Sequence, residues 1–146
     1  MKEFKLKDIM PVRAIEHKIW TIFDVLRSES VASEEYDVVL FLLSLFKDGI
    51  ISKDTLSNQG NMHEALLRSI HNSNEKTTDQ YLPIYESFKS PIKRISPKGL
   101  LTIIQVMSNV DHKVLSANFL DIFDSVLYRI TELQGRQGEE FIQPIE

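Results

Sequence analysis

The chain has 146 residues and a mass of 16.9 kDa, which is enough for one domain with its own hydrophobic core. Its 17 basic and 21 acidic side chains give a net charge of -4, which excludes a strongly basic nucleic-acid-binding module. The absence of cysteine excludes disulfides, thiolate nucleophiles and Cys-based metal sites. The longest apolar run, residues 38–43, is too short to span a bilayer, and residues 1–10 lack a signal peptide's apolar stretch. We therefore expect a soluble cytoplasmic protein without a membrane partner.

The first third of the chain predicts two helices. Apolar residues at three- and four-residue steps indicate a helix over residues 13–29. They are Ile15, Ile19, Ile22, Phe23 and Leu26. Ser33, followed by acidic residues, predicts the N-cap of the second helix. Residues 38–46 are apolar on almost every side, so this helix is expected to cross the middle of the fold and to end near Gly49.

The middle of the chain predicts shorter helices between polar loops. Residues 50–60 form a polar connection with room for one short turn, and Asn61 with Glu64 has the spacing of a capping box. The inner face of the helix that follows would carry Met62, Ala65, Leu66 and Ile70. The aromatic spacing after residue 77 indicates another helix. Because proline disrupts a helix interior, this helix is expected to begin near Pro83. Residues 90–97, with two prolines, are expected to form a loop.

The last third predicts two further helices. Ser96 as N-cap and Pro97 at the first helical position indicate the start of one. Its inner face would carry Leu100, Ile103, Ile104 and Met107. The other is expected over residues 116–134, ending at Gly135, with Leu120, Phe123, Leu127 and Ile130 facing the core. No alternating strand pattern competes with helix, so the sequence predicts an all-α, single-domain bundle of about five to six helices.

Side chains that could catalyse a reaction or hold a metal do not converge in the sequence. The four histidines are His17, His63, His71 and His112, and no two have the four-residue spacing of a helical metal site. We favour exposed or hydrogen-bonded histidines over metal ligands. There is neither a nucleophile elbow nor a phosphate-binding glycine loop. We therefore predict no catalytic residue, no metal site and no enzymatic activity for this chain alone.

One basic stretch has two interpretations. Lys89, Lys93, Arg94 and Lys98 follow one another with no acidic residue among them. On a proline-stiffened loop, these cations could bind a DNA backbone by neutralising phosphates and releasing counterions. A solvated basic loop is the favoured interpretation, and DNA contact is the alternative. Trp20, Tyr81 and Tyr85 could stack on bases, although their helical spacing favours core packing.

Residues near the N-terminus carry a resemblance to a known family. The segments are Lys18-Ile19-Trp20, Asp24-Val25-Leu26-Arg27, Glu35-Tyr36 and Val39-Leu40. Together they resemble the opening of the modification (M) subunits of type I restriction–modification systems, which are adenine-specific DNA methyltransferases. The helical N-terminal domain of that family opens with Leu-Trp-x-x-x-Asp-x-Leu-Arg, an acidic linker and a Tyr-x-x-x-Leu helix.

The C-terminus carries the second part of the resemblance. Asp121-Ile122-Phe123 leads through a long helix to residues 135–144, Gly-Arg-Gln-Gly-Glu-Glu-Phe-Ile-Gln-Pro. This looks like the family's junction, where a helix beginning Asp-x-Leu-Gly runs into Gly-Lys-x-Gly-Gly-Glu-Phe-Tyr-Thr-Pro. Glu140, Phe141 and Pro144 match that junction. The departures are Asp124, Leu127, Tyr128, Ile142 and Gln143, and residues 50–98 have no counterpart.

The resemblance implies that residues 1–134 are a non-catalytic helical N-terminal domain. Residues 135–146 would be the junction to a catalytic domain that this chain does not contain. In the family, that junction helps form the S-adenosylmethionine pocket, so Phe141 and Pro144 would contact the cofactor only together with the missing domain. The partners implied are the specificity subunit, the rest of the methyltransferase and double-stranded DNA.

Two other functions stay open at this point. One is a free-standing helical adaptor that binds only protein, through an exposed apolar face on the last helix near Ile130 and Leu133. The other is a small self-contained enzyme, which would need a polar constellation that the sequence does not show.

Overall fold

The computed structural model describes the backbone of residues 6–56 and 61–141 and the side chains of residues 9–55 and 61–135. In chain order the elements are α1 (Leu6–Ser28), the 3-10 turn η1 (Ser33–Glu35), α2 (Val38–Lys47), α3 (Lys53–Leu56), α4 (Met62–His71), α5 (Glu75–Arg94), α6 (Pro97–Ser108), α7 (His112–Ala117) and α8 (Phe119–Phe141). The described ranges contain no strand, and six of their helices have 7 or more residues. The predicted all-α, single-domain bundle is confirmed.

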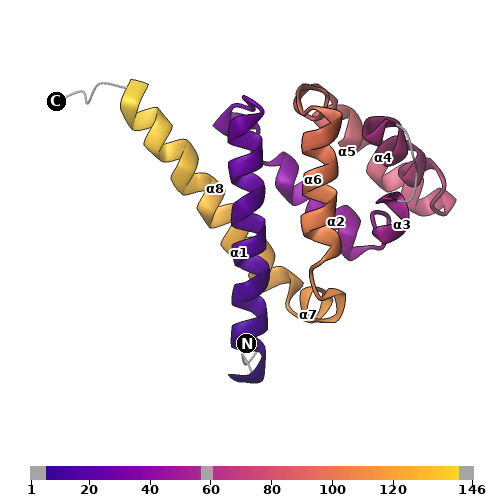
Figure 1. Ribbon diagram of the computed structural model, residues 1–146, viewed down its shortest axis with the longest axis horizontal. Helices are drawn as coiled ribbons and strands as arrows, with labels where there is room; N and C mark the ends of the chain where they lie inside the picture. The colour runs from indigo at the N-terminus through magenta and orange to yellow at the C-terminus, as the bar shows by residue number, and fades with distance from the viewer. Residues whose placement is uncertain (1–5, 57–60, 142–146) are drawn as a thin grey trace.

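The helices are arranged around the pair α1 and α6, which lie side by side (Figure 1). Helix α8 lies on one side of this pair, and α3, α4 and α5 lie on the other. Helix α2 crosses behind, and its buried side chains include Val39, Leu42 and Leu45. All buried apolar side chains of the described residues belong to one core cluster. None of the helices in the described ranges combines the length and the apolarity needed to cross a bilayer.

Helices α1 and α2 have the predicted buried faces, but both predicted starts are wrong, since α1 already begins at Leu6 and runs through Pro11. All five apolar residues predicted for the inner face of α1 are buried. Ser33 does not cap α2, because the chain first makes the turn η1, in which Tyr36 N donates to Ser33 O at 3.2 Å. This turn buries the Tyr36 ring against Phe23, with ring centroids 5.6 Å apart. Helix α2 therefore begins at Val38, later than the Ser33 cap predicts.

The short turn before α4, the N-cap Asn61 and the inner face of α4 are confirmed as predicted, whereas the described hydrogen bonds do not include the Glu64 half of a capping box. Gly49 ends α2 with a left-handed φ of 77°, which a residue with a side chain rarely adopts. The polar connection contains one short turn, α3. Asn61 caps α4 by accepting a hydrogen bond of 2.9 Å from His63 N, and the predicted inner face of α4 is buried.

Helix α5 corrects the prediction for the segment with two prolines. The helix continues without interruption through Pro83 and Pro91. Pro83 and Asp79 are both exposed, so the Asp79 carbonyl that loses its helical N–H partner lies on the side of α5 that faces water. The predicted start near Pro83 and the predicted loop over residues 90–97 are therefore wrong. Ser96 and Pro97 do start the next helix, as predicted, and all four residues of its predicted inner face are buried.

The predicted last helix is in fact two helices. Asn118 separates α7 from α8 with a non-helical backbone, and its buried side chain donates to Val114 O at 3.0 Å. The predicted start at residue 116 is wrong, and so is the predicted end at Gly135, because α8 continues to Phe141. A single glycine weakens a helix by about 1 kcal/mol, which is too little to end one that is otherwise favourable.

The buried face of α8 also differs from the prediction. Ile122, Val126 and Ile130 are at most 1% exposed, whereas Leu120 is 74% and Leu127 42% exposed. The sequence of α8 carries two apolar stripes with helical spacing, and only Ile130 of the predicted face belongs to the buried one. Which stripe is buried depends on the neighbours of α8, which are α1, η1, α2 and α7.

Candidate nucleic-acid interface

The four predicted DNA-contacting cations lie on two helices rather than on a loop. Lys89, Lys93 and Arg94 belong to the last turns of α5, and Lys98 belongs to the first turn of α6. The three cations of α5 line one shallow hollow together with Glu86 and Ser90. Lys89 and Lys93 are one helical turn apart, so their ammonium groups point to the same side. The structure thus brings three of the four cations together and leaves Lys98 outside the hollow.

Arg94 has an acidic partner that is far away in the sequence. Its guanidinium forms an ion pair with Glu35 of η1 and also donates to Ser90 Oγ at 3.2 Å. Half of the Arg94 side chain is exposed. An exposed ion pair contributes at most about 1 kcal/mol to stability, so a phosphate group can compete with Glu35 for this guanidinium.

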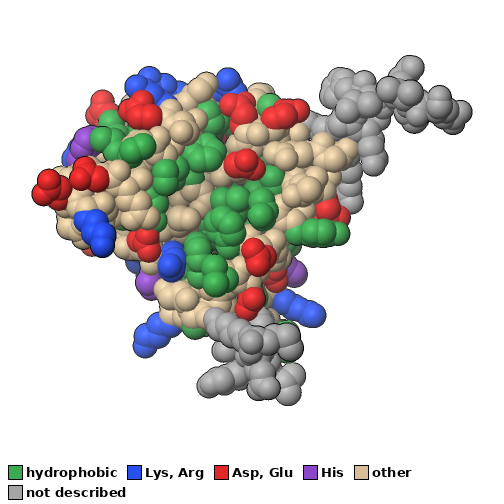
Figure 2. All heavy atoms as spheres, turned by 180° about the vertical axis from the view of Figure 1, so that it is seen from behind, with side chains coloured by type: hydrophobic (Ala, Val, Ile, Leu, Met, Phe, Trp, Pro, Cys, Tyr) green, Lys and Arg blue, Asp and Glu red, His purple; other side chains and the backbone are tan. Residues whose placement is uncertain are grey.

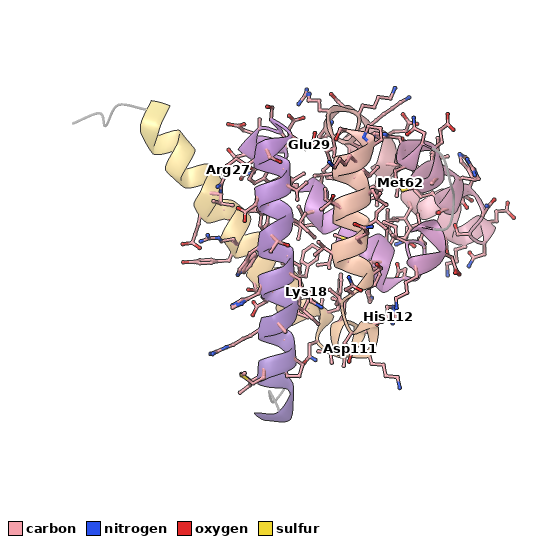
Figure 3. The ribbon with its side chains drawn as sticks, viewed as in Figure 1. Lys18, Arg27, Glu29, Met62, Asp111 and His112 are labelled. Carbon is pink, nitrogen blue, oxygen red and sulfur yellow. The ribbon has the colours of Figure 1, made fainter. Side chains whose placement is uncertain are left out.

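The start of α6 is already occupied by a carboxylate. Glu29, at the end of α1, accepts hydrogen bonds from Ser96 N at 3.1 Å and from Ser96 Oγ at 2.7 Å. Figure 3 shows Glu29 at the end of α1 nearest to α6. Gly99 leaves room for this carboxylate, since a Cβ there would lie 2.2 Å from Glu29 Oε1. A phosphate therefore cannot use the positive end of the α6 dipole without displacing Glu29.

Lys89 and Lys93 are the cations best placed for an external anion. Among the described side chains, no carboxylate forms an ion pair with Lys89, Lys93 or Lys98. Lys93 and Lys98 are exposed, whereas Lys89 is half-buried along its stem. The arrangement can neutralise a few phosphates and contains no built pocket that would read a base.

The aromatic residues that could stack on bases are part of the core instead. Tyr81 and Tyr85 are each 4% exposed. The half-buried Trp20 stacks on Phe23 at 5.8 Å, and the Arg129 guanidinium lies 5.9 Å from its ring centroid. Burial, and secondarily a hydrogen bond that the hydroxyl donates to Asp48, raises the pKa of Tyr81 above the ordinary tyrosine range. The predicted preference for core packing is confirmed.

The histidines hold helices together or face solvent. His63 Nε2 lies 3.0 Å from Ile92 O, linking α4 to α5, and His112 Nε2 lies 2.9 Å from Lys47 O, linking α7 to α2. His17 and His71 are exposed. The favoured interpretation of exposed or hydrogen-bonded histidines is confirmed. Within the described residues, no three potential ligands gather to form a metal site.

The residues matched to the family junction are only partly described. Phe141 is the last residue of α8, but its side chain lies outside the described residues, as does the whole of Pro144. Glu140 is described only as helical backbone. The implied contacts with S-adenosylmethionine therefore cannot be placed on the structure.

An exposed apolar surface on α8 was expected, but at other residues. Ile130 is 1% exposed and Leu133 packs partly buried against the core, so the predicted surface near these two is wrong. Among the side chains of α8 that the structure describes, the exposed apolar ones are Leu120, Leu127 and Tyr128. The three- and four-residue spacing of Leu120, Phe123 and Leu127 was the signal for this surface, although it was assigned to the core.

The helix that begins the second resembling segment lies against the elements that carry the first, whereas the side chains of residues 136–144 lie outside the described ones. Residues 18–40 form parts of α1, η1 and α2, and α8 packs against all three. Among the matched residues, Ile19, Leu26, Tyr36 and Val39 are buried. Comparison of the chain with protein-family models, curated proteins and solved structures gives no match.

Proposed function

We propose that this chain is the non-catalytic helical N-terminal domain of a type I adenine-specific DNA methyltransferase subunit, which contributes to subunit assembly and to DNA engagement. The observation that supports the proposal is that α8, which leads to the second resembling segment, packs directly against α1, η1 and α2, which carry the first.

Specific contacts join the helices that carry the two segments, through residues that lie beside the matched ones. Gln134 Nε2 of α8 donates to Ser33 O of η1 at 3.0 Å, and Ser125 Oγ donates to the Glu16 carboxylate of α1. The buried stripe of α8 completes the core beneath them. In the proposed role, α1, η1 and α2 form a platform that fixes the direction in which α8 leads to the catalytic domain.

The contribution to DNA binding would be electrostatic and independent of sequence. Lys89 and Lys93 would contact phosphates, and Arg94 would exchange its ion pair with Glu35 for a phosphate. The specificity subunit would read the bases, and the missing catalytic domain would hold S-adenosylmethionine and the extruded adenine. Because the net charge is -4, we expect weak binding by this chain alone.

A DNA-binding measurement tests the electrostatic part. Fluorescence anisotropy with a labelled duplex at about 50 mM salt should give a dissociation constant in the range of about 10⁻⁴ to 10⁻⁶ M. The double variant Lys89→Glu/Lys93→Glu should weaken binding about tenfold or more. The slope of the logarithm of the binding constant against the logarithm of the salt concentration should fall by about 2, because two phosphate contacts are lost. The matched control is Lys76→Glu/Lys113→Glu, in the first turns of α5 and α7, which makes the same charge change away from the hollow. Equal losses in both proteins would contradict the proposed contact surface.

The gene itself tests the family assignment. If the reading frame continues beyond Glu146 into a glycine-bearing strand–loop–helix and an Asn-Pro-Pro-Phe/Tyr motif, the assignment is supported. A stop codon directly after Glu146 would contradict it.

A second candidate function is a helical adaptor that binds only protein. The observation that favours it is the exposed apolar surface on α8, formed by Leu120, Leu127 and Tyr128. An adaptor of this kind should show no DNA affinity even at low salt. The anisotropy measurement therefore distinguishes the two candidates.

A further inference from the structure

An apolar groove runs between α5 and α8 on the face opposite to that of Figure 1. It has a volume of about 290 Å³ and is floored by α2, with walls from α5 and α8. Its lining residues are Asp37, Leu40, Phe41, Ser44, Tyr81, Ile84, Phe88 and Phe123. Figure 2 shows hydrophobic side chains gathered into a band across this face. The groove shares no residue with the basic hollow, so its role is independent of DNA contact.

The α5 wall presents apolar residues at helical spacing, and the α8 wall, formed by Phe123, continues into exposed apolar residues outside the lining. Ile84 and Phe88 are one turn apart on α5, with Ile84 38% exposed. On α8, Leu120 and Leu127 lie one turn before and one turn after Phe123. An apolar groove between two helices can bind a third helix, whose side chains at three- and four-residue steps pack into it. The occupant that fits this shape is therefore a helix with an apolar stripe.

The exposed charges at the groove are mainly acidic. Asp37 lies in the lining itself, and Asp124 lies on the exposed strip of α8, between Leu120 and Leu127. Neither carboxylate forms an ion pair with any described side chain. Figure 2 shows acidic side chains, and fewer basic ones, beside the hydrophobic band. A helix bound here meets uncompensated negative charge at its edges, which favours Lys and Arg on its flanks.

We propose that this groove binds an amphipathic helix of a partner protein whose apolar stripe is flanked by basic residues. A second copy of this chain fits less well, because its net charge is -4 and its own exposed apolar strip carries Asp121 and Asp124. Like charges facing one another oppose such a pairing. The partner helix fills the groove with its apolar side chains and pairs its cations with Asp37 and Asp124.

Synthetic peptides test the chemistry of the occupant. The first is a helical peptide of about 18 residues with leucine at three- and four-residue steps and lysine on the flanks. The second replaces every lysine with glutamate, and the third keeps the lysines but scrambles the leucine positions. In fluorescence anisotropy, we expect the lysine peptide to bind about tenfold or more tightly than either of the others. Undetectable binding of the lysine peptide, or equal affinity for the lysine and glutamate peptides, would overturn the proposal.

Variants locate the binding on the groove. Leu120→Ser/Leu127→Ser should weaken binding of the lysine peptide about tenfold, whereas Met10→Ser should not, although Met10 and Leu120 are both 74% exposed. Asp37→Lys/Asp124→Lys should reverse the preference between lysine and glutamate peptides, and Glu75→Lys/Asp79→Lys on α5 is the charge-matched control. Circular dichroism shows whether each variant keeps the helical fold. Binding that no groove variant changes would also overturn the proposal.

Two further outcomes distinguish partner binding in the groove from self-association of the chain and from DNA binding by the basic hollow. If sedimentation shows a dimer of the chain that Leu120→Ser/Leu127→Ser dissociates, the groove holds a second copy, and the proposed partner is wrong. Lys89→Glu/Lys93→Glu should leave the peptide affinity unchanged, because those residues lie outside the groove. A loss of DNA binding with intact peptide binding therefore bears only on the basic hollow.

Discussion

The two sides of the molecule are held together in different ways. On the α8 side, Ser125 bonds to Glu16 and Gln134 to Ser33, across 109 and 101 positions of sequence. On the α4–α5 side, Thr78 Oγ1 donates to Ile70 O over eight positions, and Asn74 caps α5 by accepting from Thr77 N. The segments that resemble the methyltransferase family lie on the long-range side. The α4–α5 side adds bonds of intermediate span, His63 to Ile92 over 29 positions and Arg94 to Glu35 over 59, so the two sides differ in the sequence distance that their bonds cover.

The largest expected effect on the free energy of unfolding comes from α8, where a buried residue and an exposed residue lie two positions apart. Ile122→Ala removes a fully buried side chain and should lower the free energy of unfolding by about 2–5 kcal/mol. Leu120→Ala changes a side chain that is 74% exposed and should stay within about 0.5 kcal/mol. Urea denaturation followed by circular dichroism measures both. Equal costs would mean that α8 is rotated differently on α1 and α2.

The face of α8 marks the limit of what apolar spacing predicts. The inner faces of α1, α4 and α6 were predicted correctly because each of these helices carries one dominant stripe. In α8 the stripe of Ile122, Val126 and Ile130 competes with that of Leu120, Phe123 and Leu127. Both match the helical period, so the choice between them is made by tertiary contacts that the sequence does not display.

The basic stretch shows the same limit for a candidate site. The run of cations was visible in the sequence, but Glu35, which pairs with Arg94, lies 59 positions away. Glu29, which fills the start of α6, lies 67 positions from Ser96. By contrast, the N-caps Asn61 and Ser96 were predictable because a cap bonds to a backbone N–H within three residues. Local partners can be found from spacing, whereas long-range partners require the fold.

A proline substitution tests the local side. Pro83 lies in the interior of α5, where a proline costs about 3 kcal/mol relative to alanine. Pro83→Ala restores the hydrogen bond from the N–H of residue 83 to Asp79 O. It also gives the unfolded chain more conformational entropy, which favours unfolding by about 0.4–1 kcal/mol, so we expect a net stabilisation of about 2 kcal/mol. Pro97→Ala is the control, because Pro97 sits at the first position of α6, where no helical N–H bond is missing. A destabilised Pro83→Ala protein would show that α5 needs the proline for its packing.

The smallest expected effect concerns the bond that joins the two sides. The Tyr81 hydroxyl of α5 donates to the Asp48 carboxylate at the end of α2, and the Tyr81 ring lies 6.3 Å from that of Phe41. Tyr81→Phe keeps the ring and removes the donor. Because Asp48 is partly exposed and is solvated when it loses this donor, we expect a loss of about 1 kcal/mol at neutral pH.

The pH dependence of this loss identifies its origin. Burial first, and the hydrogen bond and negative charge of Asp48 second, raise the pKa of Tyr81 in the folded state. A tyrosine in the unfolded chain releases its proton near pH 10, while folded Tyr81 still holds it, so alkali favours the unfolded state. The stabilisation is complete below about pH 10 and declines as the pH rises toward the higher folded pKa. In urea titrations from about pH 8 to about pH 11, the wild-type advantage over Tyr81→Phe should therefore shrink, and a constant difference would assign it to packing alone.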